Sequence, residues 1–133
     1  MSEENVELAR QYVEAFNRGG LDATAPLRHP EIEVFDPPDL PDADRYVGEA
    51  AVRSRVESYL AVGWDGQFDV QEYIDAGEEV VVIWHMTGTG GRGGVPLDVP
   101  ALGHVYAFQD GKARRIRQYL TRAEALKAAG LSE

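Results

Sequence analysis

The chain has 133 residues and no cysteine. This length suits one domain with a single hydrophobic core and is too short for two. Without cysteine, a disulfide framework, thiol catalysis and a cysteine-ligated metal site are excluded. The formal net charge of -10 at pH 7 disfavours nucleic acid and anionic membranes as partners. The N-terminal MSEENVELAR does not resemble a signal peptide, and no apolar run approaches the length of a membrane span. We therefore expect a cytoplasmic location.

Helical patterns dominate the first half of the chain. Apolar residues between positions 6 and 16 recur on one face of a helix, which Gly19 and Gly20 end. We expect a short second helix over 21–27, a strand near 32–35 and a third helix over about 49–62. The Pro- and Asp-rich segment DPPDLPDADR, residues 36–45, is expected to form a loop.

Strand patterns dominate the second half. We expect strands over 67–75, 80–87, 95–99, 102–109 and 112–120, with a glycine-rich hairpin loop over 88–94. Pro96 and Pro100 confine the third of these strands to a sheet edge or a bulge. Asp110-Gly111 is a strong type I′ turn signal. Thr121 and Glu124 form a capping box that begins a short last helix.

Helices followed by a run of strands indicate an α+β fold. The arrangement we expect is a curved antiparallel sheet wrapped around three N-terminal helices, with a short C-terminal helix. A pocket would lie at the open end of this sheet.

Turn geometry predicts which side chains face the pocket. A two-residue turn at Asp110-Gly111 places Val105 opposite Ile116 and Gly103 opposite Gln118 on a small, apolar face that suits a cavity wall. A two-residue turn near Gly77 likewise places His85 and Ile83 on the face of Phe68, whereas a three-residue loop there would swap these faces. The other sheet face then points outward and is apolar enough to favour a homodimer. It carries Trp84, Met86, His104, Tyr106 and Tyr119.

The run YVEAFNRGGLDATAPLRHPEIEVFDP, residues 12–37, resembles the N-terminal signature of ketosteroid isomerase. It also resembles the wider SnoaL-like, nuclear-transport-factor-2-like superfamily. The resemblance implies one SnoaL-like domain over residues 1–133, with a cone-shaped, cystatin-like α+β barrel around a hydrophobic pocket. Tyr12 falls where the isomerase has its oxyanion-hole tyrosine, and Asp36 where it has its general base. The position of the isomerase's second donor, a protonated aspartic acid, is occupied by Gly103, so His85 is the expected substitute.

These residues predict a small-molecule pocket protein. A carboxylate in an apolar pocket can abstract a proton next to a carbonyl, and buried hydroxyl donors stabilise the resulting enolate. We therefore expect an isomerase, cyclase or hydratase that uses Asp36, Tyr12 and His85 on a small apolar or carbonyl-containing ligand, without metal or cofactor. The expected pocket lining is Phe16, Tyr59, Phe68, Ile83, Gly103, Val105, Ile116, Gln118 and Leu120.

A non-catalytic interpretation stays open. Aspartate before two prolines is also an ordinary turn residue, and a tyrosine on an apolar helix face is often part of the core. A buried histidine is more often bonded to a neighbour than catalytic. The alternative is therefore a ligand-binding or dimerisation module of the same fold.

Overall fold

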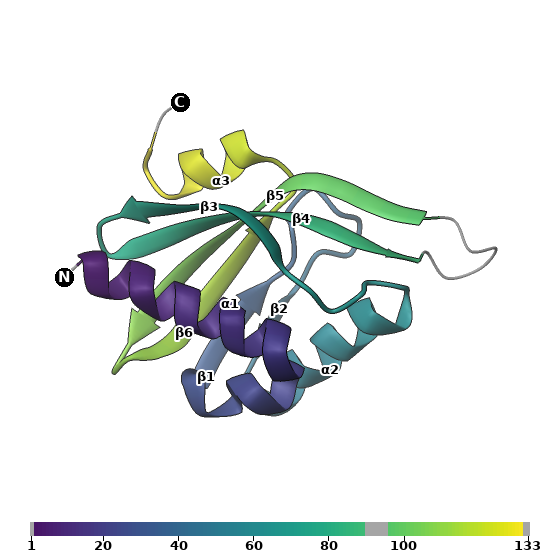
Figure 1. The fold of residues 1–133 in the computed structure, drawn as a ribbon, viewed down its shortest axis with the longest axis horizontal. Helices are drawn as coiled ribbons and strands as arrows, with labels where there is room; N and C mark the ends of the chain where they lie inside the picture. Colours follow the sequence, from purple (N-terminus) through teal and green to yellow (C-terminus); the bar gives the residue numbers. More distant parts are fainter. Residues whose placement is uncertain (1, 90–95, 132–133) are drawn as a thin grey trace.

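A computed structural model describes residues 2–89 and 96–131, so most of the loop predicted over 88–94 lies outside the described residues (Figure 1). Within them, no helix is both long and apolar enough to cross a membrane. The elements follow in the order α1 (Ser2–Thr24), a 3-10 turn (Ala25–Leu27), β1 (Arg28–Phe35), β2 (Arg45–Val47), α2 (Glu49–Ala61), β3 (Asp69–Ala76), β4 (Glu79–Thr89), β5 (Pro96–Gln109), β6 (Lys112–Tyr119) and α3 (Arg122–Ala128).

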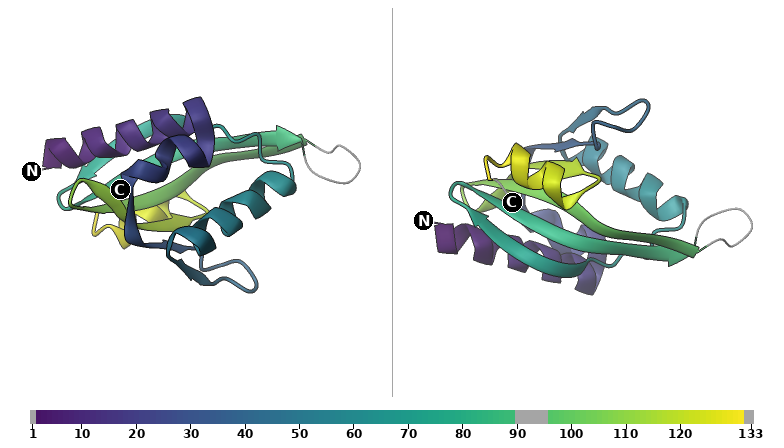
Figure 2. Two further views of the ribbon diagram at one scale, coloured as in Figure 1. Left: turned by 90° about the horizontal axis from the view of Figure 1, so that it is seen from below. Right: turned by 90° about the horizontal axis from the view of Figure 1, so that it is seen from above.

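The strands form one six-stranded sheet in the order β2-β1-β6-β5-β4-β3. Helices α1 and α2 cover one face and α3 covers the other, as the two views of Figure 2 show. The α+β fold is confirmed. The sheet is mixed, however, because β1 runs parallel to β6 while the other neighbours are antiparallel. The expectation of a purely antiparallel sheet was wrong for this one pair, which brings the N-terminal strand beside the last one.

The first helix is interrupted where Gly19-Gly20 predicted its end. Gly20 has a φ of 65° and a ψ of -145°, which are not helical, and a second helical segment follows it to Thr24 within α1. The predicted second helix is the end of α1 together with the 3-10 turn that contains Pro26. The two strands expected over 95–99 and 102–109 are one strand, β5, and Pro100 lies at a bulge within it.

A β-bulge in β6 inverts the predicted faces of the last hairpin. The two-residue turn is present, since Gln109 pairs with Lys112 and φ is positive at Asp110 and Gly111. Two steps later the extra residue Arg114 shifts the register, and each following residue of β6 then faces the opposite way. As a result His104 pairs with Gln118. The predicted pairs Val105–Ile116 and Gly103–Gln118 were therefore wrong.

A second bulge, at Gln71 in β3, has the same effect on the preceding hairpin. It places Val70 opposite Trp84, so Phe68 lies on the face of Trp84 and not on that of Ile83. Ile83, Gly103 and Val105 instead form the outer face under α3, where the Cβ of an alanine at position 103 would lie 2.3 Å from the Ala125 Cβ. Only glycine lets α3 approach this closely. The prediction that Ile83, Gly103 and Val105 line the pocket was wrong.

The same bulges turn the predicted outer residues inward. Trp84, Met86, His104 and Tyr106 line the interior, and Tyr119 packs beside the cluster beneath α3. Their predicted outward orientation was wrong for the first four. Dimerisation through this sheet face stays a prediction, but most of the apolar side chains that favoured it point inward.

Candidate functional site

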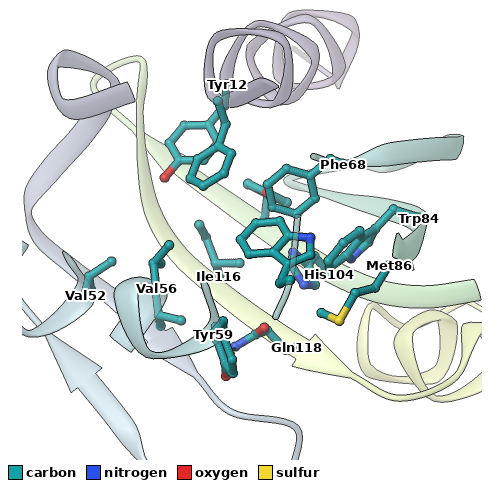
Figure 3. A pocket seen from close by; sticks show the side chains of 14 residues that line it. Tyr12, Val52, Val56, Tyr59, Phe68, Trp84, Met86, His104, Ile116 and Gln118 are labelled. Atoms are coloured by element: carbon teal, nitrogen blue, oxygen red, sulfur yellow. Dashed lines mark hydrogen bonds between the residues drawn. The ribbon is translucent and has the colours of Figure 1, made fainter. Parts of the chain in front are cut away.

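The interior holds a cavity with two adjoining chambers between the sheet and helices α1 and α2 (Figure 3). The inner chamber has a volume of about 60 Å³ and the outer one about 220 Å³. Five residues line both chambers, and we call them the neck. They are Tyr59, Trp64, Met86, His104 and Gln118.

The walls of both chambers are apolar and aromatic. Phe16 stacks on Trp64 with ring centroids 5.4 Å apart, and Phe68 lies 4.5 Å from Trp84. No Asp, Glu, Lys or Arg is among the described residues that line either chamber. Such a cavity favours uncharged ligands, because a bare charge taken from water into an apolar site is strongly destabilised.

Most of the predicted lining residues contact the cavity. Phe16, Tyr59, Phe68, Ile116 and Gln118 line the inner chamber, and Leu120 lines the outer one. These six come from α1, α2, the segment before β3, β6 and the residue that follows it. The structure therefore brings together residues from both halves of the sequence around one cavity.

Asp36 lies just beyond the cavity wall, where four donors hold its carboxylate. Arg55 Nε and the Tyr59 hydroxyl donate to Oδ1 over 2.9 and 2.8 Å. The Tyr46 hydroxyl and the Asp44 amide donate to Oδ2 over 3.1 and 3.2 Å. The side chain is 1% exposed, and Asp36 reaches the cavity only through its bond to Tyr59.

This environment keeps Asp36 ionised. Burial alone would raise its pKa, but the hydrogen bonds from Tyr59, Arg55 and the Asp44 amide outweigh burial and lower the pKa. A carboxylate with a lowered pKa and four donors is a weak base. This arrangement suits Asp36 as a fixed counter-charge for Arg55 more than as a base that abstracts a proton.

The ring of Tyr12 lines the inner chamber, but its hydroxyl is already hydrogen-bonded. The ring lines the chamber, while the hydroxyl accepts a hydrogen bond of 3.3 Å from Arg28 Nη1. Burial raises the pKa of Tyr12, although the neighbouring Arg28 opposes this effect. Tyr12 and Asp36 therefore lie on different sides of the cavity wall, and each is engaged by its own arginine.

His85 lies on the outer side of β4, away from the cavity. Its Nε2 contacts Asp98 Oδ1, and its Nδ1 lies 3.8 Å from Asp69 Oδ2. It is not among the described residues that line either chamber. The histidine at the cavity is His104, which is 7% exposed, and burial lowers its pKa to about 3. His104 is therefore neutral at physiological pH.

Two polar residues of this region, His104 and Arg55, were not predicted as part of the site. His104 was assigned to the wrong face because the bulge at Arg114 has no marker in the sequence. Arg55 was overlooked, although it lies three residues after Val52 and four before Tyr59, on the face of α2 that turns toward the cavity. Its guanidinium lies over the Tyr59 ring at 4.6 Å. A charged residue on an apolar stripe was the available signal.

Comparisons with known proteins agree with this architecture. The sequence matches no curated protein. A similar solved structure is an NTF2-like protein from Burkholderia thailandensis E264, with 25% identity, coverage of 91% of this chain and 95% of that one, and a TM-score of 0.74. Bal32a, from a soil-derived mobile gene cassette, has 22% identity, 89% coverage of each chain and a TM-score of 0.74. TerC, co-crystallised with polyporic acid, has 18% identity, coverage of 96% and 98%, and a TM-score of 0.72.

These structures share the fold, and other similar ones are described as NTF2-like or cystatin-like. The family model of the SnoaL-like domain matches residues 9–116, which span α1 to β6 and therefore include most of the cavity wall. The chain belongs to the SnoaL-like domain family.

Proposed function

We propose that this protein binds a small, uncharged, mainly apolar molecule in the two-chambered cavity. The observation that carries this proposal is the lining itself, which is aromatic and aliphatic and has no charged side chain among its described residues. Ligand pockets are typically apolar with a few placed polar groups, and here those groups lie at the neck. TerC, which has the same fold, was co-crystallised with a small organic molecule, polyporic acid.

An anionic ligand fits this cavity poorly. Arg55, whose guanidinium lies over the ring of the neck residue Tyr59, is already bound to Asp36 at 2.9 Å. Arg28 is likewise bound to Glu49 at 2.7 Å. Neither guanidinium lines a chamber, so a ligand carboxylate would enter without a counter-charge.

Binding can be tested with naphthalene, an uncharged aromatic probe. Trp64 and Trp84 line the cavity, so ligand entry should change tryptophan fluorescence. A Val56→Phe variant adds a ring to the inner chamber and should weaken binding at least tenfold. Val47→Phe, at a position 47% exposed on β2, is the matched control and should bind normally. Saturable binding that Val56→Phe leaves unchanged would contradict the proposed site.

A second candidate is catalysis by Asp36, as an isomerase, cyclase or hydratase acting on a carbonyl compound. The observation in its favour is the 2.8 Å hydrogen bond from Tyr59, a neck residue, to the Asp36 carboxylate. Turnover of an enolisable ketone or a benzisoxazole probe, lost in Asp36→Asn, would support it. Unchanged ligand binding by Asp36→Asn together with no turnover by the wild type would leave binding as the activity.

A further inference from the structure

His104 and Gln118 face each other across β5 and β6 at the neck. They are direct partners in the antiparallel register, and both line both chambers. Directly opposed side chains have Cβ atoms about 5 Å apart. Among the residues that the structure describes, no hydrogen bond joins the two side chains. The Gln118 amide oxygen and one ring nitrogen of His104 are therefore available to a ligand group placed between them.

The orientation of the Gln118 amide is fixed by its neighbours. Nε2 donates to the Phe35 carbonyl over 3.0 Å and to the Tyr59 hydroxyl over 3.4 Å. Figure 3 shows this nitrogen directed toward Tyr59 and the amide oxygen directed away from it. Because Tyr59 in turn donates to the Asp36 carboxylate, the whole chain of bonds holds Gln118 in one orientation. Gln118 thus offers the neck an acceptor, Oε1.

His104 offers the complementary group. A neutral imidazole has one N–H donor and one acceptor nitrogen. Its Nδ1 is fully buried and lacks a hydrogen-bond partner among the described residues, so this nitrogen does not open onto the cavity. Because His104 lines both chambers, Nε2 is the ring nitrogen that can meet a ligand. With the proton on Nε2, this nitrogen is a hydrogen-bond donor.

We propose that the His104–Gln118 pair recognises a hydroxyl group, so that the ligand is an uncharged, hydroxylated apolar molecule such as a phenol or an enol. The hydroxyl hydrogen bonds to Gln118 Oε1 while its oxygen accepts the N–H of His104. A ketone or ester oxygen cannot donate to Gln118, and a carboxylate finds no counter-charge at the neck. This inference rests on the proposed ligand binding and adds the class of ligand.

The test compares 4-propylphenol with 4-propyltoluene, in which a methyl group replaces the hydroxyl. Both dissociation constants are measured by tryptophan fluorescence for the wild type, His104→Phe, Gln118→Met and the control His85→Phe. The ratio of the two constants isolates the hydroxyl from the rest of the ligand. We expect His104→Phe and Gln118→Met each to shift this ratio about tenfold against the phenol, the size of one lost hydrogen bond. His85→Phe should leave the ratio unchanged.

The outcomes separate the two proposals. If neither probe binds the wild type, binding in the cavity is wrong and the hydroxyl inference is overturned with it. If both probes bind and the ratio changes less than twofold in His104→Phe and Gln118→Met, the hydroxyl inference alone is overturned. An equal change in His85→Phe would also overturn it, because that histidine lies outside the cavity.

Discussion

The guanidinium of Arg28 forms two parallel hydrogen bonds with the Glu49 carboxylate, each 2.7 Å long. The arginine side chain is 0% exposed, whereas that of Glu49 is 42% exposed. Arg28 also donates to the Leu21 carbonyl and to the Tyr12 hydroxyl. This one side chain therefore ties the end of α1 and the start of β1 to the first turn of α2, behind the inner chamber.

Replacing Glu49 with glutamine should be strongly destabilising. The change leaves a buried guanidinium without its counter-charge, which typically costs about 3 kcal/mol. Glu7→Gln is the matched control, because Glu7 pairs with Arg10 over 3.6 Å at the exposed surface of α1 and should contribute less than about 1 kcal/mol. Urea unfolding measures both values. Equal losses in the two variants would contradict a special role for the buried pair.

The Tyr46→Phe variant should raise the pKa of Asp36. It removes one of the four donors to the carboxylate, a bond of 3.1 Å, and should cost about 1 kcal/mol of stability at neutral pH. Because the native pKa of Asp36 is lowered, its stabilising contribution is present above the pKa of the unfolded chain and is lost as pH falls through the native value. A carboxyl-carbon NMR titration of Asp36 measures the shift, and Tyr73→Phe, which does not contact Asp36, should produce none.

The His104→Phe variant should resist acid better than the wild type. At a pH between the ordinary pKa of 6.5 and the native pKa of about 3, His104 is protonated in the unfolded chain but neutral in the native state. The unfolded state then binds more protons, so wild-type stability falls as pH decreases across this range. The free energy of unfolding is measured for both proteins from pH 7 to pH 4. As pH falls, the difference in favour of the variant should grow with a slope that approaches the uptake of one proton. Parallel pH profiles would mean that His104 is not buried in its neutral form.

Gly103→Ala should destabilise the protein without weakening ligand binding. The added methyl would meet the Ala125 Cβ at 2.3 Å and push α3 outward, at a cost of about 2 kcal/mol. Thermal unfolding measures the loss. Ligand affinity serves as the internal control, since Gly103 faces away from the cavity. A selective loss of affinity with unchanged stability would place this residue on the cavity side.

Self-association is tested by light scattering at micromolar concentration. A homodimer through the outer sheet face would have twice the chain mass of 14.6 kDa. Most of the side chains that favoured this interface lie inside. A dimer that survives charge-reversing substitution of Arg115, on the outer face of β6, would therefore use another surface. A mass of 14.6 kDa would contradict the dimer prediction.

Local signals in the sequence predicted local structure well. The Asp110-Gly111 turn has the expected positive φ angles, and the Thr121 side chain accepts from the Glu124 amide over 3.2 Å at the start of α3. Both features depend on neighbouring residues only, so the sequence carries them directly. The family resemblance over residues 12–37 also predicted the fold that the structure and the family match support.

The faces of the strands could not be predicted in the same way. Alternation along a strand assigns each side chain correctly until a bulge intervenes, and neither Arg114 nor Gln71 differs from an ordinary strand residue in sequence. Of the bulges at Arg114, Gln71 and Pro100, only the last was indicated by the sequence. The engagement of Tyr12 by Arg28 was equally hidden, because it joins residues whose approach depends on the bend at Gly20.

Arg114, the extra residue of the β6 bulge, determines which side chains of β6 line the interior. Beyond it, Ile116 and Gln118 point inward while Arg115 and Arg117 point outward. Deleting that residue would exchange the two sets and bring guanidinium groups into a cavity whose described lining contains none. Under the proposed function, the loss of one codon would thus convert a site for neutral ligands into one for anions, without altering a helix or a turn.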